Sequence, residues 1–259
     1  GLVFFRVTKE SLPKARYIQV GSLSFPTYPA SKLDEYFVDK PNIFFGYFAI
    51  PFGYDNLKSP VKAIVETEVG NVGQASIVTH IKPRARPRAD LKLARDFLDT
   101  KVNELYQAYE LELRNSSISE LSANEPHFVD PHETDETTLM ITKFREVNEN
   151  YRKVSARLIS SFNQKSTDKQ LWQGPFIRPL AAKTTSRFGE ERFYSYEGRD
   201  AGGSFHDGLD LASVAQGPVK SANSGVALFV GDLGIYGDAI IIDHGFGLTS
   251  LYGHLSATS

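Results

Sequence analysis

The sequence has no cysteine and only one methionine and one tryptophan among its 259 residues. Without cysteine, neither a disulfide framework nor a thiolate metal site can form, although this absence identifies no cellular compartment. No apolar run approaches the roughly 18 residues of a membrane-spanning helix. An excess of one charge sign is also missing, because the formal net charge is −2, and nothing here favours nucleic acid as a partner.

What is present is a composition of 41% hydrophobic and 23% charged residues, which is typical of globular proteins. The length allows two or three domains. Because the chain begins with Gly1 and its only methionine is Met140, we expect a processed or excised piece, so that any signal or membrane anchor would lie outside these residues.

Residues 1–83 have the pattern of a β-rich module. Candidate strands cover 17–20, 43–50, 61–69 and 75–81, and prolines and glycines separate them. In residues 61–69, apolar and polar side chains nearly alternate, as in a half-buried strand. We expect a β-sandwich-like N-terminal module that acts as a spacer or docking unit, with its aromatic residues in the core.

Residues 84–166 are expected to form a linker and a helical hairpin. The basic, proline-rich stretch 82–88 is interpreted as a solvated hinge. Apolar residues recur every three or four positions over 94–113 and 140–158, which predicts two helices that bury their stripes against each other. Their polar connection, 115–136, contains His127, His132 and Asp135. We interpret these as solvated loop residues, although a metal site there is conceivable.

Residues 167–259 differ in pattern from the preceding segment, because short apolar runs alternate here with glycines. Strands are predicted at 226–230, 239–243 and 248–252, so this part is expected to be an all-β region built from hairpins. The stretch Phe205-His-Asp-Gly-Leu-Asp210 precedes these strands. Its His206 and Asp210 could turn toward one point if the backbone bends, and imidazole nitrogen with carboxylate oxygen is a common ligand pair for Zn²⁺. Alone, this pair is a weak signal.

Further motifs accompany the pair in a fixed order. Upstream lies Thr185-Ser-Arg-Phe-Gly189, and downstream lie Ile241-Ile-Asp-His-Gly-Phe-Gly-Leu248 and Leu251-Tyr-Gly-His-Leu-Ser256. This ordered set, from about residue 172 to 259, resembles the M23 family of zinc metallopeptidases, the LytM/lysostaphin-type endopeptidases that cut peptide bridges in bacterial peptidoglycan. The resemblance implies a multidomain, mainly β protein with a helical segment, whose residues 167–259 form an incomplete LytM-type peptidase domain.

The resemblance also implies roles for single residues. His206 and Asp210 correspond to two zinc ligands of the family, and His254 corresponds to a catalytic histidine near the metal-bound water. His244 has no ligand role in the family pattern, so we interpret it as a turn residue. No position is assigned to substrate binding.

One departure from the family pattern is clear. The third zinc ligand of the family is the second histidine of a His-x-His motif, and no such motif occurs in these 259 residues. Catalytic zinc sites normally have three protein ligands. We therefore expect a chain truncated before that motif, which by itself binds zinc poorly and hydrolyses little. A natural variant, acting as a non-catalytic envelope module that binds or activates other cell-wall hydrolases, is the alternative.

The implied setting is the bacterial cell envelope, either periplasmic or exported. Peptidoglycan peptides are the expected partners, with other cell-wall enzymes as further partners. The helical hairpin precedes the peptidase-like region directly, so it either covers the substrate groove or serves as a structural stalk.

Overall fold

The computed structural model describes residues 1–8, 13–54, 59–77, 81, 85–114 and 135–258. The N-terminal part contains two antiparallel sheets, as expected for a β-rich module. The first has the order β1-β5-β4 and the second the order β3-β2-β6-β7. Their strands are β1 (Leu2–Arg6), β2 (Ala15–Val20), β3 (Leu23–Pro26), β4 (Tyr28–Pro29), β5 (Ile43–Tyr47), β6 (Lys62–Glu66) and β7 (Val72–Ser76). Short 3₁₀ turns at Ala30–Lys32 and Glu35–Phe37 follow β4.

Apolar side chains that alternate with polar ones along these strands pack together in the interior of the module. Ile18 and Val20 of β2 are buried together with Phe48 and Val61. The predicted strand at 75–81 differs from the structure, because β7 covers Val72–Ser76 and residues 78–80 lie outside the described part.

Two long helices follow, and both predicted apolar stripes are helical. The first helix consists of α1 (Arg95–Phe97), a wide π turn (Leu98–Val102) and α2 (Asn103–Arg114). The second consists of α3 (Glu136–Arg145), a π turn (Glu146–Tyr151) and α4 (Arg152–Asn163). The predicted connection, with His127 and His132, falls almost wholly on residues 115–134, outside the described residues.

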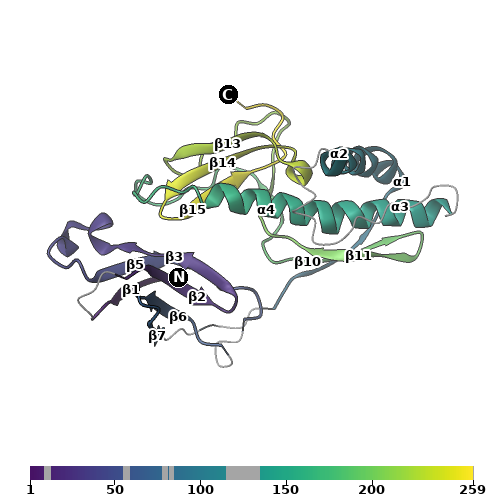
Figure 1. Cartoon of the computed structure of the whole chain (residues 1–259). Coiled ribbons are helices and arrows are strands. Elements are labelled where there is room, and N and C mark those ends of the chain that lie inside the picture. The colour runs from purple at the N-terminus through teal and green to yellow at the C-terminus, as the bar shows by residue number, and fades with distance from the viewer. Residues whose placement is uncertain (9–12, 55–58, 78–80, 82–84, 115–134, 259) are drawn as a thin grey trace.

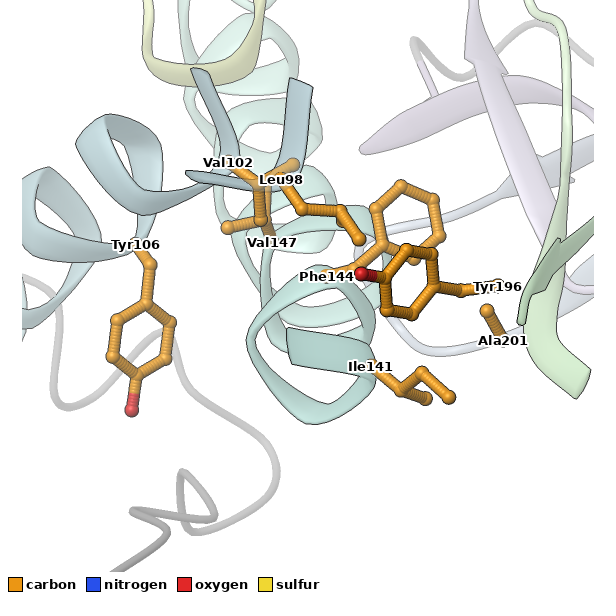
Figure 2. Close-up of a cluster of buried hydrophobic side chains, with 8 residues drawn as sticks. All are labelled: Leu98, Val102, Tyr106, Ile141, Phe144, Val147, Tyr196 and Ala201. Atoms are coloured by element: carbon orange, nitrogen blue, oxygen red, sulfur yellow. The ribbon is translucent and has the colours of Figure 1, made fainter. Parts of the chain in front are cut away.

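The two stripes pack against each other, as their spacing predicts. Figure 2 shows Leu98 and Val102 of the first helix facing Phe144 and Val147 of the second. Tyr196 and Ala201 close the same cluster from a β-hairpin that the sequence did not indicate. The helical hairpin is therefore not a separate body, because its core includes residues that come about 50 positions later in the chain.

That hairpin consists of β10 (Glu191–Tyr196) and β11 (Arg199–Phe205), and β8 (Arg88–Lys92) pairs in parallel with β10. The strand β8 includes the end of the stretch interpreted as a solvated hinge. Arg88 begins the strand, and its guanidinium lies 4.1 Å from the ring centroid of Phe193 while it pairs with Asp90. Arg88, the last charged residue of this stretch, thus lies on the sheet and contacts its neighbours there.

The C-terminal part forms the hairpin-built β region that the sequence predicts. A two-stranded sheet pairs β9 (Lys183–Ser186) with β12 (Asp210–Ala212), and a three-stranded antiparallel sheet has the order β13-β14-β15. The latter strands are β13 (Val226–Asp232), β14 (Asp238–Gly245) and β15 (Leu248–Tyr252). In Figure 1, α4 lies against this sheet, whereas α3 lies over β10 and β11.

An aromatic cluster joins the N-terminal sheets to the C-terminal region. Phe246, between β14 and β15, packs on Tyr28 and Phe45 of the first sheet and on Trp172. Phe246 is 1% exposed.

The proposed domain boundaries after residues 83 and 166 stay predictions. Within the described residues, no helix has the length and apolar character to cross a membrane.

Candidate functional site

The predicted metal pair lies where two small sheets meet. His206 directly follows β11, and Asp210 is the first residue of β12. The backbone of His206 is held from both sides, because its N–H donates to Glu190 O (2.9 Å) and its carbonyl accepts from Gly189 N–H (2.8 Å). Gly189 has φ +78°, a conformation that glycine adopts without strain, so this residue lets the turn after β9 fold back onto His206.

The backbone does bend between the two predicted ligands, and their side chains meet. His206 Nε2 lies 3.0 Å from Asp210 Oδ1. The His206 side chain is 13% exposed, whereas that of Asp210 is 49% exposed. His206 Nε2 and Asp210 Oδ1 therefore converge on one point near the protein surface, as their spacing in the sequence allowed.

The other ring nitrogen of His206, Nδ1, contacts two protein oxygens. His206 Nδ1 lies 3.1 Å from the carbonyl oxygen of Arg187 and 3.0 Å from Ser186 Oγ. A carbonyl oxygen can only accept, so Nδ1 carries the proton in this contact. Ser186 Oγ donates its own proton to Glu190 Oε1 (2.8 Å) and is left to accept from Nδ1.

Ser186 and Arg192 also act on Glu190. The hydroxyl of Ser186 and, next, the guanidinium of Arg192 hold the pKa of the Glu190 carboxyl below its usual range. A carboxylate is an acceptor only, which fixes the direction of the Ser186 hydrogen bond.

This pattern fits a metal ligand pair. In the neutral ring with Nδ1 protonated, Nε2 offers a lone pair, and two acceptor atoms 3.0 Å apart need a proton or a cation between them. Two zinc ligands in tetrahedral geometry lie about 3.3–3.5 Å apart, close to the observed separation. A histidine that donates its second N–H to a backbone carbonyl is also the usual arrangement behind a metal.

No third ligand accompanies the pair in the described part of the chain. There, no group of three or more His, Cys, Asp or Glu side chains is arranged to hold a metal ion. The ligand roles of His206 and Asp210 stay predictions that the local geometry fits.

His254, the predicted catalytic residue, lies in the turn after β15. It has φ +57°, its N–H donates to Tyr236 O (2.7 Å), and Leu255 N–H donates to Asp238 O (2.9 Å). His254 lines a cavity of about 710 Å³ together with Leu211, the neighbour of Asp210 in β12. Among the described residues, the hydrogen bonds and ion pairs of His206 and Asp210 do not include His254. The cavity thus contains His254 and reaches β12 at Leu211, whereas neither His206 nor Asp210 lines it.

Tyr236 holds the turn that carries His254, a role that the sequence did not indicate. Burial raises the pKa of its phenol, the charge of Arg152 opposes this rise, and the charge of Asp207 adds to it. Tyr236 thus lies within electrostatic range of Asp207, the neighbour of His206, while its carbonyl holds the backbone of His254.

His244 is not the turn residue that the sequence suggested. It lies within β14 and is 1% exposed. Its Nδ1 lies 2.8 Å from the carbonyl oxygen of Ser224, and its Nε2 lies 2.8 Å from Ser250 Oγ. Both ring nitrogens are used inside the core, which agrees with the expectation that His244 is not a ligand.

Comparisons with known proteins agree with the resemblance read from the motifs. Residues 204–259 match the model of peptidase family M23. Over 54 residues the chain is 44% identical to the DD-carboxypeptidase/endopeptidase Mpg of Neisseria meningitidis serogroup B and of Neisseria gonorrhoeae. Each match covers 21% of this chain and 13% of the relative, so the similarity spans about an eighth of the relatives' length.

A solved structure from Pseudomonas aeruginosa, provisionally assigned to peptidase M23, aligns with 99% of this chain and 72% of its own. The sequence identity is 14% and the TM-score is 0.45.

Proposed function

From the match of residues 204–259 to peptidase family M23, we propose that the protein is a zinc-dependent endopeptidase that hydrolyses peptide cross-links of bacterial peptidoglycan. The observation that carries the proposal is the convergence of His206 Nε2 and Asp210 Oδ1 inside the matched segment. The names of the Neisseria relatives, which combine carboxypeptidase and endopeptidase activity, support cleavage of peptide bonds. The bacterial cell envelope is the corresponding location.

His206 and Asp210 would hold the zinc through Nε2 and Oδ1. A bound zinc ion polarises the scissile carbonyl and lowers the pKa of a bound water. These 259 residues supply two of the usual three protein ligands, so we propose that by themselves they bind zinc weakly and hydrolyse little.

His254 would act from the wall of the 710 Å³ cavity. An imidazole there can accept a proton from the attacking water or donate a hydrogen bond to the developing oxyanion. The peptide would lie in the same cavity, between Leu211 and His254, because this hollow borders both β12 and the turn after β15.

The test uses the protein in its full natural length and purified peptidoglycan, with released fragments separated and identified by mass spectrometry. We expect cleavage that a chelator abolishes and added zinc restores. The variant His206→Ala should lose both cleavage and bound zinc, whereas Asp207→Asn, a change in the neighbouring carboxylate, should retain bound zinc. Cleavage insensitive to chelator would contradict zinc dependence.

The same experiment decides the second candidate function. If the protein sediments with peptidoglycan but releases no fragment under any metal condition, the endopeptidase proposal fails. A non-catalytic envelope module would then be the better description, and stimulation of a separate cell-wall hydrolase would be its positive evidence.

A further inference from the structure

Arg192 of β10 connects three groups around the candidate ligands. Its Nε donates to Glu190 Oε1 (3.0 Å), and one terminal nitrogen donates both to Ser186 Oγ (2.8 Å) and to Asp210 Oδ2 (3.2 Å). The Arg192 side chain is 20% exposed, so the guanidinium is largely withdrawn from water. Charge-assisted bonds of this kind are stronger and more directional than those of an exposed pair.

The contact between Arg192 and Asp210 gives the two carboxylate oxygens of Asp210 different partners. Oδ2 accepts from Arg192, while Oδ1 faces His206 Nε2 at 3.0 Å. A free carboxylate can offer either oxygen, or both, to a cation. With Oδ2 occupied, Asp210 presents a single oxygen in a fixed direction.

The contact with Ser186 acts on His206. Ser186 lies opposite Asp210 in the pairing of β9 with β12, and its Oγ is 3.0 Å from His206 Nδ1. The bonds to Arg192 and Glu190 hold this hydroxyl, so its remaining lone pair is directed at the imidazole. Arg192 thereby reaches both predicted ligands, one directly and one through a single side chain.

We propose that Arg192 is a positioning residue that orients His206 and Asp210 as a preformed pair, with Asp210 restricted to one coordinating oxygen. The identity of the cation, zinc, rests on the proposed function. Lysine could not replace Arg192, because its ammonium is a point charge and lacks the planar fork that serves several acceptors at once.

The charge of Arg192 must be separated from its geometry in any test. Removal of a cation beside Asp210 would by itself increase the attraction of the site for a metal ion. Arg192→Lys keeps the charge and removes the fork, so it isolates the geometric contribution. Arg88→Lys is the matched control, because Arg88 is paired with Asp90 on the adjacent strand β8 and contacts neither ligand.

The experiment titrates zinc into the protein in its full natural length and follows the ring nitrogen resonances of His206 by NMR, assigned through their loss in His206→Gln. We expect Arg192→Lys to raise the dissociation constant roughly 10- to 100-fold, the range found for groups that orient metal ligands. Arg88→Lys should match the unchanged chain. Circular dichroism and the unfolding midpoint establish that every variant is folded. If Arg192 had only a structural role, Arg192→Lys would lower the unfolding midpoint together with the zinc affinity.

Ser186→Ala provides a second test that leaves the bond between Arg192 and Asp210 in place. It removes the link from Arg192 to His206, and we expect weaker zinc binding here as well. If Arg192→Lys and Ser186→Ala both bind zinc within twofold of the unchanged chain, the proposal is wrong. The same holds if Arg88→Lys weakens binding as much as Arg192→Lys.

Failure of this proposal is distinguishable from failure of the proposed function. Unchanged zinc binding in the variants overturns the role of Arg192 and leaves the endopeptidase proposal standing. Absence of any zinc effect on His206 in the unchanged chain overturns the ligand pair and the role of Arg192 together. Loss of zinc affinity in Arg192→Lys, combined with no cleavage of peptidoglycan, retains the positioning role and rejects the peptidase.

Discussion

The partners of each ring nitrogen distinguish His206 from His244. His206 donates from Nδ1 to protein acceptors and directs Nε2 at a carboxylate on the surface side. His244 has a backbone carbonyl at Nδ1 and a serine hydroxyl at Nε2, both inside the core. A histidine whose two nitrogens are both used by buried protein groups has no lone pair left for a ligand, so its role is structural.

The substitution His244→Ala is expected to lower the free energy of unfolding by roughly 2–4 kcal/mol, because it leaves two buried partners unsatisfied and opens a cavity. Urea unfolding followed by circular dichroism measures this change. Zinc binding at His206 should stay as in the unchanged chain. Weaker zinc binding without a loss of stability would contradict the structural role.

At the scale of elements, the residue that caps the start of α3 also contacts a β-hairpin distant in the sequence. Asp135 is its N-cap and accepts from Thr138 N–H (3.1 Å) and from the Thr138 hydroxyl (2.5 Å). Arg199, at the start of β11, also donates to Asp135 (3.3 Å). The sequence pattern allowed a solvated loop residue here, whereas the structure makes it the point where helix and hairpin meet. The bonds from Thr138, followed by the charge of Arg199, lower the pKa of Asp135.

This lowered pKa predicts a pH dependence of stability. Because the folded value lies below the unfolded one, Asp135 stabilises the fold above its unfolded pKa, and this contribution is lost as pH falls through the folded pKa. Asp135→Asn keeps a capping side chain but removes the titration. The difference in unfolding free energy between the chain and this variant should therefore shrink on acidification. A difference that is constant between neutral and acidic pH would show that the carboxylate charge contributes nothing.

At the scale of the whole molecule, the cluster around Phe246 joins segments from opposite ends of the chain. Its ring centroid lies 4.9 Å from that of Phe45 and 5.0 Å from that of Tyr28, both in the N-terminal sheets. Next to His206 in the sequence, Phe205 makes another contact of this kind. The guanidinium of Arg86 lies 4.0 Å from the ring centroid of Phe205 and 4.5 Å from that of Phe52. The N-terminal sheets thus contact the C-terminal region at Phe246, and Arg86 bridges Phe52 to Phe205, the residue before His206.

Phe246→Ala is expected to cost roughly 3–5 kcal/mol of unfolding free energy, the usual range for a buried phenylalanine. The fluorescence of Trp172, the only tryptophan, reports this junction directly during urea unfolding. Phe188→Ala, at a ring that is 58% exposed, serves as the control and should change stability by less than about 0.5 kcal/mol. Equal effects of the two substitutions would mean that the junction does not stabilise the fold.

The sequence by itself determined the elements whose pattern is local. The stripes at 94–113 and 140–158 predicted two helices, and the strands at 226–230, 239–243 and 248–252 correspond to β13, β14 and β15. Periodicity sufficed because each of these segments buries one face of its own. The spacing of His206 and Asp210 likewise allowed the convergence that the structure contains.

Only the tertiary structure decided which distant residues support that pair. Ser186, Glu190 and Arg192 come 14 to 20 positions before His206, and nothing in their spacing separates them from ordinary surface residues. They meet His206 and Asp210 because β9 pairs with β12 and β10 pairs with β11. Strand pairing depends on which edges meet during folding, a non-local choice that a single strand's pattern does not encode. The candidate pair His206 and Asp210 was therefore visible in the chain, whereas the residues that contact it became visible only in the folded molecule.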